Sequence, residues 1–480
     1  MGKGFNVAKI KTGWWVCGAV LLVGLCLGLL FLGRYLALRS PSQSVAALTA
    51  KAWAGDPEAQ AKLGGMYAFG YGVPRDNGKA LRWARKGAQQ GDAYAQFILG
   101  FLYESGRGVG KDEKEAVQWY RKSAEQGYPV AQANLGSMYA EGRGVGQDDK
   151  EALRWYRKAA GQDYAPAEYD LGRMYAKGRG VPVDDKEALD WYTKAAVHGD
   201  RYAQFALGVR YKNGHGVYQS DEQAARWYRR SAEQGYAYAQ TNLAFMYRVG
   251  RGVAQSDEEE VLWLRRAAEQ GDAFAQRALG LAYAKGRGIA HDDREAVQWY
   301  RKAADQGDAP AQALLGYMYV KGRGVAQDDK EAALWFRKAA DQGDPYAQGS
   351  LGRMYSEGRG VVQDDEEAVG WFQKGAKQGD ANAEFGLGKA YQEGKGVPSD
   401  SVAAYAWYSL AAAQGTAEAI TARDEIQKQM TDEDVAQGQR KVAQFQAATQ
   451  PAKSSATEPS TERSAEPSSE PSPGLRPTSP

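Results

Sequence analysis

The stretch LGSMYAEGRGVGQDDKEALRWYRKAA, residues 135–160, decides how the whole chain is interpreted. It places a Gly-x-Gly, Gly142 to Gly144, between two segments whose apolar residues recur at intervals of three and four, the spacing of amphipathic helices. A glycine-rich connection of this kind could cradle a phosphate or form a structural turn. The sequence favours the turn, because the connection follows a helical pattern instead of a strand and recurs along the chain.

The recurrence is regular. Pairs of Leu-Gly, once Leu-Ala, follow one another at intervals of 36 residues without insertion or deletion, beginning at Leu63, Leu99, Leu135, Leu171, Leu207, Leu243, Leu279, Leu315, Leu351 and Leu387. Tryptophans keep the same interval at Trp83, Trp119, Trp155, Trp191, Trp227, Trp263, Trp299, Trp335, Trp371 and Trp407. A fixed period of this length predicts stacked copies of one helix–turn–helix unit, with the tryptophan as a packing element.

One unit illustrates the pattern. A first helix (helix A) is expected to begin at Pro129 and to end before Gly142, where glycine allows a positive φ. A second helix (helix B) is expected to begin at Asp148, whose carboxylate can accept free backbone amides, with Glu151 completing a capping box. Its apolar and small residues fall at one buried face, from Ala152 to Ala160.

These residues closely resemble the Sel1-like repeat, a relative of the tetratricopeptide repeat, over roughly residues 55–414. The resemblance implies an all-α fold, an α/α superhelical solenoid of about ten 36-residue helix–turn–helix repeats. It also implies an adaptor whose stacked helices hold partner proteins. A bacterial subset of the family is cysteine-rich and secreted, and this chain departs from it, because Cys17 and Cys26 both lie outside the repeats.

The run Gly13 to Gly33 carries no charge and is long enough to span a bilayer, which predicts one N-terminal transmembrane helix. The density of lysines before it favours an inside N-terminus. We therefore expect a single-pass protein of the bacterial inner membrane with repeats in the periplasm, and cytoplasmic repeats as the alternative. Gly24 and Gly28 form a Gly-x-x-x-Gly, a spacing compatible with a weak dimer.

The expected organisation is a short basic tail (1–12), the transmembrane helix (13–33), a linker (34–54), ten repeats (55–414), a C-terminal helical cap (415–447) and a disordered Pro/Ser-rich tail (448–480).

Composition and motifs argue against other functions. The balance of 61 basic against 59 acidic residues gives no field that favours nucleic acid. His198, His215 and His291 stand at positions that are polar in other units, without metal-ligand spacing, so we expect them to be solvated substitutions. We expect no enzyme activity, no cofactor and no metal.

The candidate binding residues are the aromatic and arginine residues at the varying positions of helix A, on the face that lines the concave groove in tetratricopeptide proteins. They are Tyr94, Phe97, Phe101, Tyr202, Phe205, Tyr238, Phe245, Phe274, Tyr317, Tyr346, Arg173, Arg210, Arg277 and Arg353. Such residues dominate interface energetics, so this face is expected to bind a protein or peptide. Two alternatives remain: that several of these side chains only pack between helices, and that an aromatic face binds carbohydrate or peptidoglycan.

Overall fold

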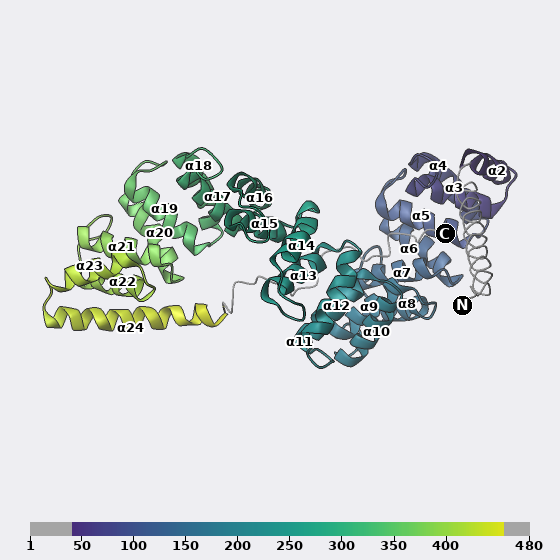
Figure 1. Ribbon diagram of the computed structural model, residues 1–480. Coiled ribbons are helices and arrows are strands. Elements are labelled where there is room, and N and C mark those ends of the chain that lie inside the picture. Colours follow the sequence, from purple (N-terminus) through teal and green to yellow (C-terminus); the bar gives the residue numbers. More distant parts are fainter. Residues whose placement is uncertain (1–40, 456–480) are drawn as a thin grey trace, which may run out of the picture. The chain divides into compact units, whose positions relative to one another are not determined.

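The computed structural model describes residues 41–455, with side chains described for 45–447. This range contains 23 α-helices and no strand, as the all-α prediction requires (Figure 1). It divides into two compact units, residues 41–198 and 199–455. The expected membrane segment, residues 13–33, lies outside the described residues, and none of the described helices combines the length and apolar character needed to cross a membrane.

The first unit consists of α2 (Pro41–Trp53), α3 (Pro57–Phe69), α4 (Asn77–Gln89), α5 (Ala93–Ser105), α6 (Glu113–Glu125), α7 (Pro129–Glu141), α8 (Asp149–Ala160), α9 (Ala165–Lys177) and α10 (Asp185–Val197). The second consists of α11 (Arg201–Asn213), α12 (Asp221–Glu233), α13 (Ala237–Val249), α14 (Asp257–Glu269), α15 (Ala273–Lys285), α16 (Asp293–Asp305), α17 (Ala309–Lys321), α18 (Asp329–Asp341), α19 (Pro345–Glu357), α20 (Asp365–Lys377), α21 (Ala381–Glu393), α22 (Ser401–Ala413), α23 (Ala417–Gln427) and α24 (Asp432–Ser455). From α3 to α22 the odd-numbered helices are A helices and the even-numbered ones are B helices.

Helix B begins where the sequence predicts, although only one of the two hydrogen bonds expected of a capping box is formed. The Asp148 carboxylate accepts hydrogen bonds from the backbone amides of Lys150 and Glu151 at 2.9 and 3.0 Å. The reciprocal bond expected from the Glu151 side chain is replaced, because the Asp148 amide donates to the Tyr139 carbonyl at 3.0 Å. That bond uses a carbonyl near the end of helix A and so ties the two helices of the repeat together.

The Gly-x-Gly is a structural turn. Gly142 ends α7 with φ 68°, and Gly144 has φ 66°. A Cβ on Gly144 would lie 2.1 Å from the backbone carbonyl oxygen of Glu113, at the start of helix B in the preceding repeat. The second glycine is therefore required both by the turn and by the close approach of two repeats.

A second glycine contact lies inside eight of the ten repeats, where helix A meets an aromatic ring of helix B. In the third repeat a Cβ on Gly136 would lie 2.8 Å from the Tyr156 ring. The sixth repeat has Ala244 at the position of Gly136 and Leu264 at the position of Tyr156, and both side chains are buried. The larger residue on helix A is thus matched by a smaller one on helix B, which keeps the packing volume.

The repeated tryptophan packs as expected, and a basic residue three positions later covers its outer ring face. Trp155 is buried, with the Lys158 ammonium 4.2 Å from its ring centroid. Arg230 lies over Trp227 in the same way at 4.6 Å. The covering cation leaves little of the ring face for a ligand, and it stabilises the helix end through a cation–π contact.

A ladder of glutamines joins successive repeats. Gln126, which follows α6, donates to the side-chain oxygen of Gln96 on α5 at 2.8 Å and to the Gly91 carbonyl, at the end of the preceding repeat, at 2.9 Å. Gln96 in turn donates to the carbonyl of Ala88 at 3.4 Å. Equivalent Gln–Gln pairs occur in the other repeats, with departures in the fourth and tenth.

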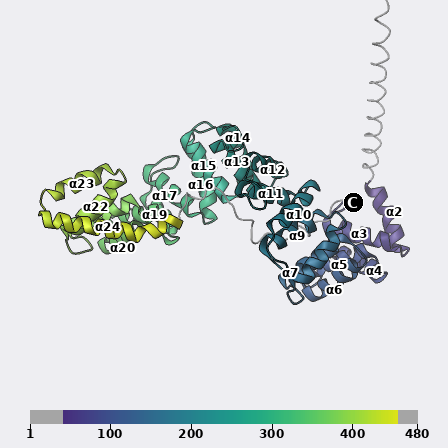
Figure 2. The same ribbon diagram turned by 90° about the horizontal axis from the view of Figure 1, so that it is seen from below.

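Both ends of the repeat array are covered by helices. The segment expected as a linker, residues 34–54, contains α2, and Trp53 meets Trp83 edge-on at 5.0 Å between ring centroids. After the tenth repeat, α24 lies beside α22 in both views (Figures 1 and 2), where Phe445 stacks on Trp407 at 4.2 Å. The helix α24 continues to Ser455, past residue 447 at which a disordered tail was expected to start.

Candidate functional site: the surface of the A helices

Four of the candidate binding residues are buried, so the expectation that they are exposed is wrong. The side chains of Phe97, Phe101, Phe205 and Arg210 are at most 7% exposed. Phe97 and Phe205 lie in the seam between helix A and helix B, where each packs on a buried tyrosine of helix B. Phe101 packs on Phe69 of the preceding A helix at 5.2 Å.

Arg210 is buried for a different reason. It occupies a position that holds methionine in most repeats, such as Met138 and Met174, and that faces the core. Its guanidinium donates to the backbone carbonyl of His215 at 3.3 Å. The alternative that these side chains fill space between helices therefore holds for all four residues.

Most of the remaining candidates are half-buried at the edges of the A helices, and one is fully exposed. The half-buried residues are Tyr94, Tyr202, Tyr238, Phe245, Phe274, Tyr317, Tyr346, Arg173 and Arg277, and the exposed one is Arg353. Arg277 forms an ion pair with Asp308 at 2.9 Å and lies over the Phe274 ring at 4.8 Å. These contacts hold the arginine and the aromatic ring in fixed positions while part of each remains accessible.

Two tyrosine clusters form where a tyrosine replaces the usual Asp before an A helix. Tyr128 contacts Tyr94 and Phe97 in the first unit, with ring centroids 5.9 and 5.4 Å apart. Tyr236 contacts Tyr202 in the same way in the second unit, at 5.1 Å. Burial raises the pKa of Tyr94 to about 12, because the charged phenolate would be desolvated in this cluster.

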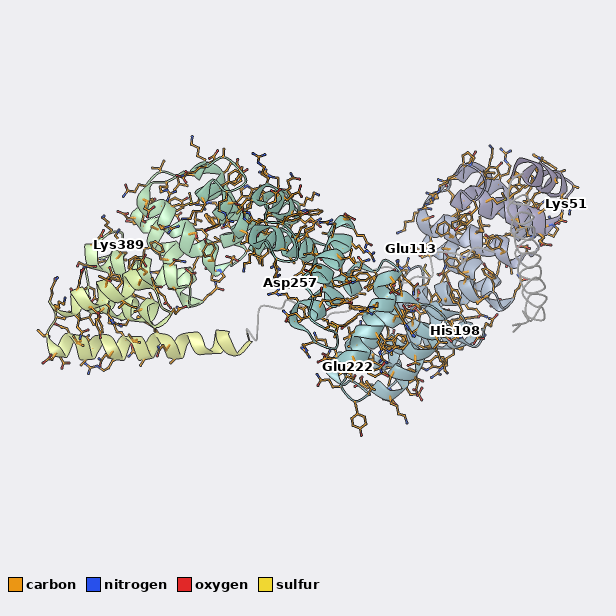
Figure 3. All side chains as sticks on the ribbon, in the orientation of Figure 1. Lys51, Glu113, His198, Glu222, Asp257 and Lys389 are labelled. Atoms are coloured by element: carbon orange, nitrogen blue, oxygen red, sulfur yellow. The ribbon has the colours of Figure 1, made fainter. Side chains whose placement is uncertain are left out.

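A pocket of about 340 Å³ opens on the A helices of the last two repeats, within the second unit. Its floor is apolar and its rim carries both signs of charge. The floor includes Ala368, Val369, Phe372, Phe385 and Ala390, and the rim includes Arg353, Glu357, Asp365, Lys389, Glu393, Lys395 and Glu418. Lys389 on α21 is labelled in Figure 3.

Gly386 on α21 lines the pocket and lets an aromatic ring of helix B pack closely against this helix. It takes the position of Ile98 and Leu314, and a Cβ there would lie 2.5 Å from the Phe372 ring. The pocket has the size and the apolar floor that suit one large side chain of a protein partner, and the rim can orient charged groups beside it.

Among the candidate residues, Arg353 lines this pocket. The other lining residues are not among the candidates, although Lys389 stands at the same repeat position as Arg353, Tyr317 and Phe245. Gly386 could not be identified from the sequence, because its role depends on the position of the Phe372 ring in the fold.

Half-buried aspartates stand before the A helices of this region. The carboxylates of Asp344 and Asp380 accept hydrogen bonds from the amides of Ala347 and Ala383, both at 2.8 Å. Burial nevertheless raises the pKa of both carboxyls, and the negative charge of Asp344 adds to the effect at Asp380. The desolvation of each carboxylate raises its pKa by more than the hydrogen bonds from the start of the helix lower it.

The three histidines are all exposed, as expected of solvated substitutions, but they differ in their contacts. His215 is exposed, and His291 is exposed with Nε2 3.3 Å from the Asp293 carboxylate. His198 instead forms a hydrogen bond to the buried carboxylate of Glu168, which raises the pKa of the imidazole.

Comparison with known proteins agrees with the fold. The model of the Sel1 repeat family matches ten times without a gap, from residues 57–92 to residues 381–416. The crystal structure of c5321, a protective antigen present in uropathogenic Escherichia coli strains and displaying an SLR fold, is 34% identical, with 89% of this chain and 99% of that chain covered and a TM-score of 0.52. The Sel1 repeat protein from Oxalobacter formigenes is 38% identical over 64% of this chain and 89% of its own, with a TM-score of 0.48.

A search of curated proteins gave no match. The family model covers residues 57–416, and its units coincide with the helix pairs α3–α4 to α21–α22. The chain therefore belongs to the Sel1 repeat family, whose members generally serve as scaffolds for protein–protein interaction.

Proposed function

We propose that the protein is a membrane-tethered scaffold that binds a partner protein through the exposed edges of its A helices. The observation that supports this most is the pocket of the last two repeats, in which an apolar floor is surrounded by charges from α19, α20 and α21. A pocket with a desolvated centre and a polar rim is the arrangement that anchors a protein partner.

The half-buried aromatic residues extend this surface. Tyr317 and Tyr346 stand on the A helices α17 and α19 of the same unit, and Tyr238 and Phe274 on α13 and α15. Tyrosine and phenylalanine offer a large contact area at a small cost in side-chain entropy, which suits interfaces. We assign the binding role to these residues and to Arg353, and withdraw it from the four buried ones.

Site-specific photo-crosslinking of the full-length chain in its own cell tests the surface. A photoreactive residue at position 353 or 389 should crosslink to another protein, and one at Lys377, exposed on helix B, should not. The charge-reversed variant Arg353→Glu/Lys389→Glu should reduce adducts formed from position 317 by at least tenfold. Equal adducts from positions 353 and 377, or adducts unaffected by charge reversal, would contradict the proposal.

The tether is a separate element of the proposal and is supported by the uncharged run Gly13 to Gly33. We propose that it holds the chain in the inner membrane with the repeats exported. A compartment-specific reporter fused after Ala447 should report an exported C-terminal side, and the full-length chain should sediment with membranes. Activity of a cytosol-restricted reporter alone would reverse the orientation, and recovery of a shortened soluble chain would exclude the anchor.

A further inference from the structure

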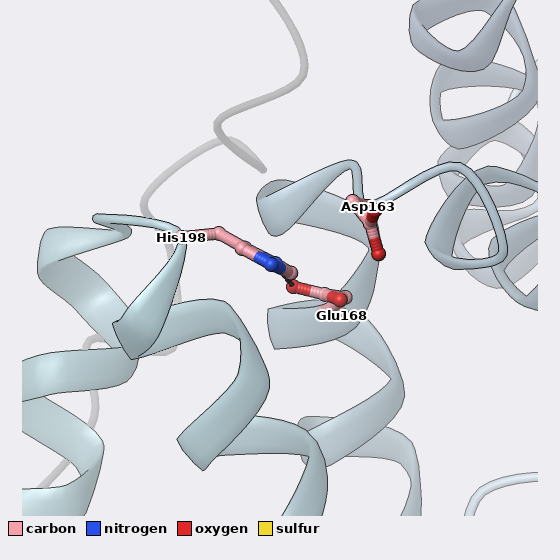
Figure 4. A group of neighbouring side chains, drawn as sticks. All are labelled: Asp163, Glu168 and His198. Atoms are coloured by element: carbon pink, nitrogen blue, oxygen red, sulfur yellow. Dashed lines mark hydrogen bonds and ion pairs between the residues drawn. The ribbon is translucent and has the colours of Figure 1, made fainter.

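Three departures from the repeat pattern meet at one junction in the first unit. The Gln–Gln pair of the ladder is replaced by His198 and Glu168 in the fourth repeat. Asp163 stands at the end of the third repeat, where the other nine repeats have glycine. Asp163 and His198 are 35 positions apart in the chain with Glu168 between them, yet the three residues come together in the fold (Figure 4).

The geometry follows from the ladder. In five of the other repeats the glutamine after helix B reaches both its partner on helix A and the carbonyl of the glycine before that helix, as Gln162 does with Gln132 and Gly127, each at 2.9 Å. Asp163 occupies this glycine position before the A helix of the fourth repeat. In the fourth repeat, Nδ1 of His198 lies 2.8 Å from the Glu168 carboxylate, and one donor atom from each of the three residues lies within 4.8 Å of the others.

Two of the three substitutions are unfavourable for the fold. Glu168 is a carboxylate with a side chain only 2% exposed, and it cannot donate the hydrogen bond that Gln132 gives to the carbonyl of Ala124. Asp163 has φ 58° and is the one non-glycine residue with positive φ among the described residues. Without a compensating interaction, either the glutamate at position 168 or the aspartate at position 163 would lower the stability of the fold.

The tenth repeat provides an internal comparison. There Glu384 occupies the position of Glu168, but the ladder glutamine is kept, and Gln414 donates to Glu384 at 2.8 Å. The preceding repeat also keeps its glycine, Gly379. A glutamate in the ladder therefore needs neither a histidine nor a nearby aspartate to be accommodated, and the cluster around Glu168 requires another explanation.

We propose that Asp163, Glu168 and His198 bind a divalent transition-metal ion such as Zn²⁺. An imidazole nitrogen and carboxylate oxygens are ligands that Zn²⁺ accepts, and two carboxylates balance its charge. Binding at roughly 2.0–2.2 Å from each donor atom requires the Asp163 carboxylate to approach the other two donors, which this exposed side chain can do by rotation, and the His198 and Glu168 atoms to separate slightly. The half-exposed His198 leaves room for water as a further ligand.

The experiment is a titration of the purified full-length chain with Zn²⁺ alone, by equilibrium dialysis and metal analysis. The variants Asp163→Gly, Glu168→Gln and His198→Gln each restore the residue of the other repeats, so they should fold. The wild type should bind one ion at this site, and each variant should lose at least tenfold in affinity. His291→Gln, which removes the exposed histidine beside Asp293, serves as the matched control and should bind as the wild type does.

Co²⁺ gives a second readout, since a protein-bound ion with few ligands should show a visible absorption band that His198→Gln abolishes. Absence of saturable binding would mean that His198 and Glu168 form an ion pair only, and would overturn the proposal. Binding that the three variants leave unchanged would overturn it as well. The crosslinking test at position 353 is independent of the metal, so the two proposals can fail separately.

Discussion

Substitution of Gly352 by alanine should destabilise the ninth repeat, although alanine is the better helix former. A Cβ on Gly352 would lie 2.6 Å from Cδ1 and 2.8 Å from Cε1 of Phe372. Carbon atoms pack best at about 3.5–4.0 Å, so the ring must move by roughly 1 Å. The Phe372 side chain is buried and also lies against Gly386, so the ring can move only towards the pocket that it lines.

The matched control is Gly370→Ala on α20 of the same repeat, where a Cβ would meet no atom within 4 Å. This variant should gain about 1 kcal/mol from the helix propensity of alanine. Overpacking a core costs about 1–3 kcal/mol, and the constrained ring favours the upper end of that range. Since the propensity term is the same in both variants, Gly352→Ala should be about 3 kcal/mol less stable than Gly370→Ala.

Hydrogen exchange of the full-length chain, followed on peptides from α19 and α20, is the suitable assay, because long repeat arrays do not unfold in one step. A difference of about 3 kcal/mol corresponds to roughly a hundredfold difference in exchange. The double variant Gly352→Ala/Phe372→Leu reproduces the natural pair Ala244 and Leu264, and should be less damaged than the sum of its single variants. Equal exchange in the two glycine variants, or additive damage in the double variant, would refute this account of the packing.

Three further outcomes are expected. Phe205→Ala should lower the stability of the fifth repeat by about 3–5 kcal/mol, because it leaves a cavity. Tyr238→Ala, at a half-buried position, should lower stability by about half of that or less, and hydrogen exchange of α11 to α13 compares the two variants. Burial raises the pKa of Asp380 in the folded state, so its contribution to stability is present below its ordinary pKa and is lost as the pH rises through the raised value. Asp380→Asn should therefore have a higher melting temperature than the wild type at pH 7, and this difference should disappear towards pH 3. Lys338→Gln removes an ammonium 3.8 Å from the Trp335 ring centroid and should cost about 0.5–1 kcal/mol, seen as faster exchange in α18.

The repeat fold could be predicted from the sequence because its period and its core positions are recorded ten times in the chain. The binding surface was harder, since a varying position is not necessarily an exposed one. Phe97 and Phe205 stand at a varying position but are buried against the helix B tyrosine of their repeat, and Arg210 varies within the core. The pattern of variation alone does not separate these causes.

The cluster of Asp163, Glu168 and His198 was visible in the sequence only as three unrelated departures. Their proximity depends on how the end of one repeat meets the ladder of the next, and that is a property of the stacked helices. Once the glutamine ladder was located, the sequence positions alone identified the junction at which all three of its members change.

The ladder has a consequence for how such a chain can change its length. The hydrogen bonds of the ladder that cross between repeats join each repeat to its immediate neighbour at a fixed separation in the sequence, as the bond from Gln126 to Gly91 does. Duplication or loss of a 36-residue segment by recombination therefore rebuilds the same bonds at the new joint, whereas a segment of another length does not. The junction of Asp163 with His198 is an exception, because removing either the third or the fourth repeat separates its members. The proposed metal site therefore depends on the order of these two repeats, whereas the ladder bonds elsewhere can be rebuilt when the array is extended or shortened.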